Sequence, residues 1–191
     1  MITEVKQKIK FINFLINKAA TIADGLYLNC SVKNLDLSEN KITDKGFEYF
    51  IDVPLKNNTL ENLDVSKNMI SDLSCKDFIL NLEKSSIEKL NFFDNQLRNE
   101  SGTSLIQSLR ANRNIIKVNI KLNRIHTRII EEIRRLIKIN IDNSKMKYIP
   151  NLKKEIRQNF VEDTDFAETE KKIHEIFDNG KTVKIFYLVI A

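Results

Sequence analysis

Apolar residues recur along this chain in a fixed order, with one asparagine in each unit. Val32, Leu35, Leu37 and Ile42 surround Asn40 with the spacing apolar-x-x-apolar-x-apolar-x-x-Asn-x-apolar. A period of this kind predicts stacked units, because one unit cannot bury its apolar face alone. The pattern occurs four times, and its asparagines, Asn40, Asn68, Asn95 and Asn123, lie 28, 27 and 28 residues apart.

Each unit predicts a short strand followed by a helix. Leu35 and Leu37 are two positions apart, which places both side chains on the same side of a strand. Asn40 turns inward as well, where its amide can bind backbone groups of the bend and of the neighbouring unit. The rest of each unit has the spacing of an amphipathic helix. We expect these helices at 43–50 after a Thr-Asp start, from the Ser-Asp pair at 71–72 to residue 82, and at 102–109.

A weaker copy of the pattern lies upstream of the first strong one. Ile9, Ile12, Phe14, Asn17 and Ala19 fit the template, but the asparagine is only 23 residues before the next one in the series. We interpret this segment either as a shortened N-terminal repeat or as a simple capping helix.

The four strong copies contain the segments LDLSENKIT, LDVSKNMIS, LNFFDNQLR and VNIKLNRIH, and together they extend from residue 32 to about 140. These segments closely resemble the leucine-rich repeat family, and within it the ribonuclease-inhibitor-like subclass. The resemblance implies an α/β fold, a curved solenoid with a parallel sheet on the concave side and helices on the convex side. It also implies a platform for binding more often than an enzyme.

Two parts of the chain differ in pattern. Residues 1–145 hold the four repeats and the degenerate one, and residues 146–191 predict a helical C-terminal extension. Pro150 marks a break near the start of that extension. The elements expected after it are helices at 151–160 and 164–177 and a strand at 182–190. An isolated apolar strand has to pack on its own domain, pair with another chain, or be the edge of a longer protein.

The positive charge is concentrated near the end of the repeats. The net charge is +5, yet residues 110–157 carry 14 Lys and Arg against 4 Asp and Glu. A helix at 124–140 would place its isoleucines on one side and leave the cations outside that stripe. We interpret these cations as a contact for an acidic protein surface, such as that of tubulin or actin, or as an ordinary solvated helix face. The basic face comprises Arg128, Arg134, Arg135, Lys138, Lys145, Lys147, Lys153, Lys154 and Arg157.

The outward positions of the strands define a candidate binding face. Exposed apolar side chains beside polar neighbours are typical of contact hot spots, and Phe93 and Leu122 have this setting. The alternative is that the C-terminal segment of the same chain covers them. The partner-binding residues that we expect on the concave face are Asp36, Asp64, Asn91, Phe93, Asn119, Lys121 and Leu122.

The composition argues against several classes of function. Hydrophobic residues make up 42% and charged residues 30% of the 191 positions, as in ordinary globular proteins. His126 and His174 lie far apart and the four glycines are scattered, so we expect no enzyme, no cofactor and no metal site. No apolar run is long enough to span a membrane, and we expect no secretory leader. Cys30 and Cys75 lack a metal spacing. Two cysteines do not suggest a disulfide framework, which favours a reducing, intracellular compartment.

These patterns favour a non-enzymatic module that binds other proteins. We expect a scaffold subunit of a large cytoplasmic assembly. The chain resembles subunits of the axonemal dynein regulatory complex, and this resemblance implies an assembly of the cytoskeleton or cilium. The alternatives are a tropomodulin-like regulator of actin, a GTPase-regulatory adaptor and a nucleic-acid-associated adaptor; nucleic acid is weaker because no stacking aromatic residues lie among the cations. The repeats begin close to Met1, which leaves no space for an N-terminal region of the tropomodulin kind, so the axonemal interpretation is preferred.

Overall fold

Five short parallel strands, one from each repeat, form a single sheet in the part of the chain that the computed structural model describes. That part comprises residues 6–8 and 16–159, with side chains described from 18 to 144. Leucines at equivalent positions, such as Leu35 and Leu63, pair at the same level across the sheet. The strands pair in the order β1 (Lys6–Lys8), β2 (Asn34–Asp36), β3 (Asn62–Asp64), β4 (Lys89–Asn91) and β5 (Lys117–Asn119).

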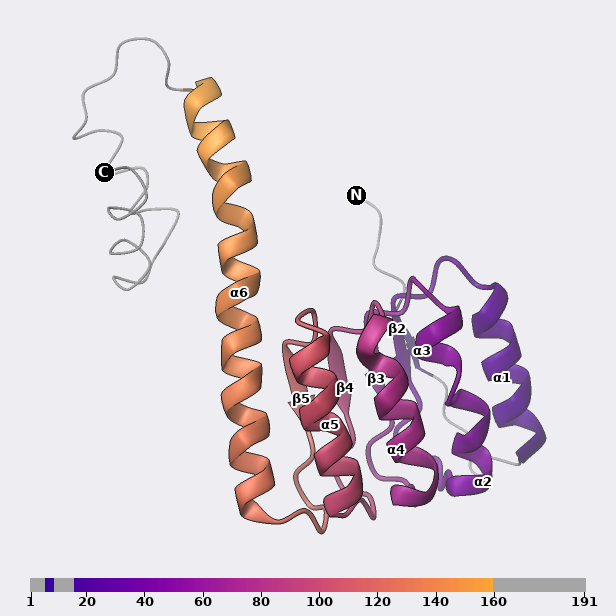
Figure 1. Ribbon diagram of the computed structural model, residues 1–191. Helices are drawn as coiled ribbons and strands as arrows, with labels where there is room; N and C mark the ends of the chain where they lie inside the picture. Colours follow the sequence, from indigo (N-terminus) through magenta and orange to yellow (C-terminus); the bar gives the residue numbers. More distant parts are fainter. Residues whose placement is uncertain (1–5, 9–15, 160–191) are drawn as a thin grey trace. The chain divides into compact units, whose positions relative to one another are not determined.

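Helices connect the strands and, from α1 to α5, lie side by side over one face of the sheet (Figure 1). This arrangement confirms the predicted α/β repeat fold. The chain divides into two units, Met1–Met146 and Lys147–Ala191, and the packing described below belongs to the first. The described helices are α1 (Ile16–Leu28), α2 (Asp44–Phe47), α3 (Val53–Lys56), α4 (Asp72–Leu80), α5 (Asn99–Ala111) and α6 (Thr127–Asn159), with the 3-10 turns η1 (Glu48–Phe50) and η2 (Asn81–Lys84).

The helix bounds differ in places from those expected. The single helix expected at 43–50 is α2 followed by η1, and Thr43 makes no side-chain cap hydrogen bond. Pro54 stands at the start of α3, and a proline cannot continue the hydrogen bonds of a preceding helix, so this segment consists of short pieces. Ser71 does cap α4, since its Oγ accepts a hydrogen bond from Leu73 N–H at 3.3 Å. Helix α5 begins at Asn99, earlier than the expected start at 102.

Four phenylalanines fill the space between the sheet and the helices of three successive repeats. The ring centroid of Phe47 lies 5.8 Å from that of Phe50, 5.1 Å from that of Phe78 and 6.2 Å from that of Phe92. All four side chains are fully buried. Offset and edge-to-face contacts of this kind add about 1 kcal/mol per pair to the burial of apolar area. The core is therefore continuous from one repeat to the next.

The N-terminal repeat has a different register from the one that the sequence suggested. β1 pairs Gln7 with Leu35, a full 28 residues later. Asn17, expected to continue the asparagine series, lies in α1 instead, and Ala19 is buried on that helix. The template proposed for residues 9–19 is therefore wrong in its register, because the apolar spacing from residue 16 onward belongs to a helix.

The repeated asparagines form a series of inward amides that we call the strand-side ladder: Asn40, Asn68, Asn95 and Asn123. Nδ2 of Asn68 donates to the carbonyl oxygens of Leu37 at 3.0 Å and Val65 at 2.9 Å. Its Oδ1 accepts from the N–H groups of Asn40 at 3.1 Å and Ile42 at 2.8 Å. Nδ2 of Asn95 and of Asn123 likewise donates to the preceding repeat. The amides of Asn68, Asn95 and Asn123 thus each join two repeats. Asn123 at the end of the series is only half-buried.

A second series, which the sequence pattern did not predict, lies at the helix ends of the repeats, and its last member, Asn140, lies within α6. Nδ2 of Asn57 donates to the carbonyl oxygens of Leu26 at 2.6 Å and Asn29 at 3.0 Å. Asn140, which is 1% exposed, donates in the same way to carbonyl oxygens of the repeat before it, including that of Ile115 at 3.0 Å. The first part of α6 is thereby fastened to the array. This helix-end ladder comprises Asn29, Asn57, Ser85, Asn112 and Asn140.

The serine in the helix-end ladder coincides with a shorter loop. Oδ1 of Asn57 accepts a hydrogen bond at 2.7 Å from the N–H of Leu60, three positions on, and so closes the loop before β3. Ile87 is the counterpart of Leu60, and it follows Ser85 by only two positions. Ser85 Oγ instead donates to the carbonyl oxygen of Leu82 at 3.1 Å. The single 27-residue step of the period is located at this loop.

Acidic side chains at helix starts bind the start of the next helix. The carboxylate of Asp44 accepts hydrogen bonds from Ser71 N–H at 2.9 Å and from the Oγ atoms of Ser71 and Ser74, both at 2.7 Å. Asp72 repeats the arrangement with Ser101 Oγ at 2.6 Å. Burial by itself would raise the pKa of Asp44, but the hydrogen bonds from Ser71 and Ser74 outweigh it and hold the pKa below its ordinary value of 3.8.

Helix α6 continues past the last repeat. Pro150, where we expected a break, lies inside this helix. A proline inside a helix removes one N–H from the hydrogen-bond series and crowds the carbonyl group four residues earlier, but a helix can continue on both sides of it with a bend. The predicted break is therefore wrong. The helix expected at 164–177 and the strand expected at 182–190 lie outside the described residues.

We predict that Asn68→Ala destabilises the fold strongly, because it removes the amide that binds the buried carbonyl oxygen of Leu37 and the buried N–H groups of Asn40 and Ile42. At about 1 kcal/mol or more for each unsatisfied group, the free energy of unfolding falls by about 3 kcal/mol. Asn123→Ala is the matched control at the half-buried end and is expected to lose less than half as much. Urea unfolding followed by circular dichroism measures both, and equal losses would contradict the role assigned to the strand-side ladder.

We also predict a pH effect of Asp44. Its pKa is lowered in the folded state, so its contribution to stability is present above pH 3.8 and is lost as the pH falls through the folded pKa. Asp44→Asn should reduce the free energy of unfolding by about 1 kcal/mol at neutral pH. It should also flatten the decline below pH 3.8 relative to the unmodified protein. Glu48→Gln, which removes an exposed carboxylate from η1, should leave that decline unchanged; unfolding curves across this range decide.

Candidate functional site

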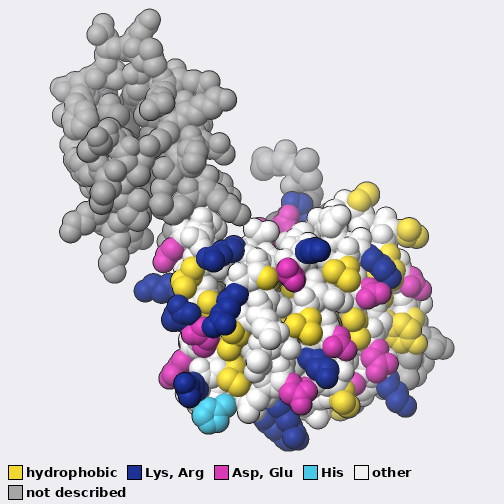
Figure 2. Space-filling view, viewed as in Figure 1, with side chains coloured by type: hydrophobic (Ala, Val, Ile, Leu, Met, Phe, Trp, Pro, Cys, Tyr) yellow, Lys and Arg dark blue, Asp and Glu magenta, His cyan; other side chains and the backbone are white. Residues whose placement is uncertain are grey.

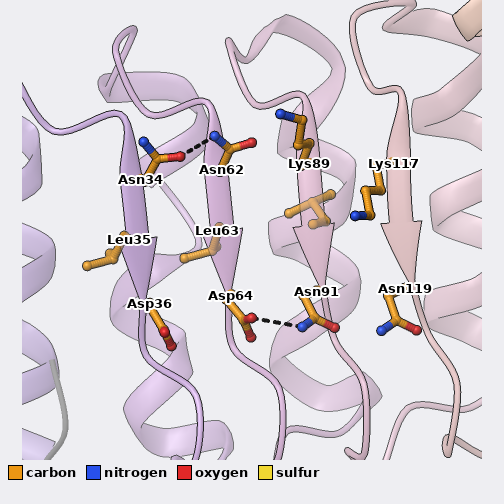
Figure 3. A pocket seen from close by; sticks show the side chains of 11 residues that line it. Asn34, Leu35, Asp36, Asn62, Leu63, Asp64, Lys89, Asn91, Lys117 and Asn119 are labelled. Carbon is orange, nitrogen blue, oxygen red and sulfur yellow. Dashed lines mark hydrogen bonds between the residues drawn. The ribbon is translucent and has the colours of Figure 1, made fainter. Parts of the chain in front are cut away.

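The face of the sheet opposite the helices, here called the strand face, holds an open groove that crosses β2 to β5 (Figure 3). Its volume is about 380 Å³. The side chains that line it stand on both sides of the inward leucines, because alternate residues of a strand share one face. They form two rows, of which the first is Asn34, Asn62, Lys89 and Lys117 and the second is Asp36, Asp64, Asn91 and Asn119.

The charge of the groove changes sign along its length. Asp36 and Asp64 stand on β2 and β3, and the exposed Lys89 and Lys117 stand on β4 and β5. Figure 3 shows the two lysines on neighbouring strands in the same row, with the carboxylates in the other row on the other two strands. A bound segment of opposite polarity would meet complementary charges at both ends.

The carboxylates of the groove are held in place by hydrogen bonds from their own repeats and, for Asp64, from the next repeat. Oδ1 of Asp64 accepts hydrogen bonds from Ser66 N–H at 2.9 Å and Ser66 Oγ at 2.6 Å. Asn91 Nδ2 donates to the other oxygen at 2.8 Å. Asp36 and Ser38 repeat the first two bonds at 3.0 and 2.6 Å. Fixed acceptors of this kind lose little side-chain freedom when a partner binds.

The structure brings together part of the face that the sequence predicted. Asp36, Asp64, Asn91 and Asn119 line one groove, as their shared position in the repeat suggested. The row that contains Lys89 and Lys117 was not predicted, because the predicted face comprised only positions that follow the first inward leucine of each strand. The two-residue alternation of a strand exposes the position before that leucine equally, so the signal was present in the sequence.

Phe93, Lys121 and Leu122 lie beyond the strand ends, in the turns that follow. Phe93 is half-buried, Lys121 is exposed and Leu122 is 65% exposed. The φ angle of Leu122 is 56°, in the left-handed region, as it is at the equivalent Asp94 with 54°. This region costs a residue with a branched side chain about 1 kcal/mol. Leu122 is therefore both exposed and strained.

The described side chains of the basic face are exposed, but one of them is bound to a carboxylate of the same chain. Figure 2 shows Lys and Arg side chains gathered over the region of α5 and α6. Nε and Nη2 of Arg135 both donate to the carboxylate of Glu132 at 2.8 Å, and Arg110 Nη2 donates to it at 3.0 Å. These hydrogen bonds lower the pKa of Glu132 to about 2. Arg135 is thus engaged within the chain, whereas Arg128, Arg134 and Lys138 are exposed on the described part of α6.

Several predicted residues lie elsewhere. His126 is exposed, and its Nδ1 accepts a long hydrogen bond of 3.4 Å from Arg128 N–H. Cys75 is fully buried, and burial raises the pKa of its thiol well above the ordinary value, while Cys30 is exposed. The described residues contain no cluster suited to a metal ion, and no described helix combines the length and apolarity needed to cross a membrane. Side chains outside the described residues include those of Lys145, Lys147, Lys153, Lys154 and Arg157.

Comparisons with known proteins agree with the geometry of the array. A family model described as a leucine-rich repeat matches residues 28–50 and 56–78. Repeats, parallel sheet and flanking helices together define a leucine-rich repeat protein. A search of curated protein sequences found no match.

Two solved structures have a similar fold. One is actin-binding site 2 of leiomodin-1, with a TM-score of 0.69 and 14% identity over 78% of this chain and 88% of that one. The other is the C-terminal domain of Caenorhabditis elegans tropomodulin, with a TM-score of 0.65 and 12% identity over 78% of this chain and 92% of that one. At such identities the similarity concerns the fold alone.

We predict that the packing of the first part of α6 against α5 requires glycine at position 102. A Cβ atom there would lie 2.7 Å from Cγ2 of Ile129 and 3.0 Å from Cγ2 of Ile125. Gly102→Ala should therefore lower the free energy of unfolding by about 2 kcal/mol and speed amide exchange in the first part of α6. Gly25→Ala is the control, since nothing lies within 4 Å of its added methyl group, and it should gain about 0.5 kcal/mol. Loss of stability in both variants would contradict the close contact.

Proposed function

We propose that this protein is a non-enzymatic protein-binding module and that the strand-face groove holds an extended segment of its partner. The observation that carries this proposal is the groove itself, with carboxylates on β2 and β3 and lysines on β4 and β5. Its open shape and fixed polar groups suit a peptide segment better than an enclosed small molecule. The bound segment has a basic residue over Asp36 and Asp64 and an acidic residue over Lys89 and Lys117.

Actin is the partner that we favour. The similar leiomodin-1 structure is an actin-binding site, and the similarity covers 78% of this chain. The exposed cations Arg128, Arg134 and Lys138 add a second surface that would attract an acidic protein filament. A scaffold role in an axonemal complex stays a prediction from the sequence, and its partner would be tubulin or a tubulin-associated protein.

The test is co-sedimentation of the purified chain with actin filaments and, in parallel, with microtubules. The double variant Lys89→Glu with Lys117→Glu should bind about tenfold more weakly, because it reverses the basic half of the groove. The matched control reverses two exposed lysines on the helix side, Lys45→Glu with Lys84→Glu, and should keep its affinity. Urea unfolding verifies that both variants remain folded.

The outcomes separate the candidates. Binding to filaments that only the groove variant loses supports the proposal with actin as the partner. Binding to microtubules alone, lost in the same variant, keeps the groove and transfers the partner to the axonemal candidate. Equal loss in both double variants would assign the binding to overall charge and overturn the role of the groove.

A further inference from the structure

β5 is the last strand of the described sheet, and its outer edge carries backbone N–H groups whose equivalents at β2, β3 and β4 pair with the next strand. Phe92 N–H donates to the carbonyl oxygen of Asn119 at 2.8 Å, and equivalent bonds join β2 to β3 and β3 to β4. The equivalent groups of the last repeat are the N–H groups of Ile120 and Leu122, and the described sheet ends at β5. An edge of this kind is a template for one more strand.

A second groove, of about 90 Å³, runs beside this edge between β5 and α6. Val118 is half-exposed in it, whereas Leu90, its neighbour in the same register on β4, is 2% exposed. Ile130 and Ile137 of α6 form the opposite wall and are likewise only partly buried. The apolar core therefore reaches the surface at this end of the described array.

Leu122 extends the apolar surface at the end of this edge. It is 65% exposed at a left-handed φ of 56°, so both the solvent exposure of its side chain and its backbone conformation are unfavourable. Its equivalents in the preceding repeats are the polar residues Glu39, Lys67 and Asp94, which share that conformation. A leucine at this position gains stability when a further segment of protein covers it.

The charges around the edge are positive. Lys117, Lys121 and Arg134 are exposed, and the last two line the groove. An added strand would turn every second residue toward Val118 and Ile137 and the residues between them toward the strand face, beside Lys117. Complementarity in charge and polarity therefore favours an added strand in which apolar residues alternate with acidic ones.

We propose that the free edge of β5 binds an extended segment of a partner protein, in which apolar and acidic residues alternate, as an additional parallel strand. Main-chain hydrogen bonds to the N–H groups of Ile120 and Leu122 supply affinity, and the groove between β5 and α6 selects the apolar side chains. This site is distinct from the strand-face groove, because its ligand runs along β5 instead of across the strands.

The experiment uses the full chain and labelled synthetic peptides, with binding followed by fluorescence anisotropy. The probe alternates aspartate with valine and isoleucine; its controls carry lysine in place of aspartate, or a central proline that prevents strand pairing. The aspartate peptide should bind at least about tenfold more tightly than either control. In ¹⁵N-labelled protein its binding should shift the amide signals of Ile120 and Leu122.

Two variants test the site itself. Leu122→Asn should raise the free energy of unfolding, since asparagine tolerates the left-handed conformation, yet weaken the peptide by about fivefold. Asp94→Asn changes the equivalent turn of the preceding repeat and should leave the affinity unchanged. Ile137→Asp places a carboxylate in the groove and should also weaken the peptide, while Ile106→Asp on α5 should not.

Other occupants give different results. Equal binding of the proline peptide, or no amide shifts at Ile120 and Leu122, would overturn the proposal. Crosslinks from Ile137→Cys to residues 182–190 of the same molecule would assign the edge to the chain's own C-terminal segment. Crosslinks between two molecules, with a dimer in analytical ultracentrifugation, would assign it to a second copy. Loss of peptide binding in the Lys89 and Lys117 double variant, with Leu122→Asn unaffected, would move the peptide to the strand-face groove.

Discussion

The need to pair buried backbone groups governs this structure. Each described strand has three residues, so strand pairing alone leaves most of the bends between sheet and helices without hydrogen bonds. Side-chain amides provide the rest, and they do so between repeats: Asn68 binds backbone groups of the repeat before it, and Asn57 does the same at the helix ends. A buried polar group without a partner is costly, so these amides decide which repeats can be neighbours.

The regular part of this framework was predictable from the sequence. The spacing of Asn40, Asn68, Asn95 and Asn123 predicted the strand positions, because an apolar-x-apolar pair followed by asparagine fits few other local structures. The helix-end ladder was not predicted, since Ser85 breaks its residue type and the short loop at that point changes its spacing. The N-terminal register was wrong for another reason: over a few residues, helical and strand templates share apolar positions, and Asn17 belonged to the helix.

The candidate site was predictable in part. Equivalent positions in the repeats placed Asp36 and Asp64 together on one face, as the groove has them. The engagement of Arg135 by Glu132 was not predicted, because helical spacing allows several such pairs and Glu131 also lies about one helical turn before Arg134 and Arg135. The exposure of Val118 was equally hidden, since its pattern is that of a core residue and its exposure follows from its place at the edge of the described sheet.

The cross-repeat hydrogen bonds also suggest how such an array changes length. Because each bond joins a position to its counterpart in the adjacent repeat, a tandem duplication of one period keeps all donors opposite their acceptors, wherever in the period the break falls. A single-residue insertion does not, unless it falls in a loop whose closing side chain can change with it. The combination of Ser85 with a loop one residue shorter than that after Asn57 is such a case. Growth by whole units and tolerance of small changes at one loop are therefore properties of the same hydrogen-bond pattern.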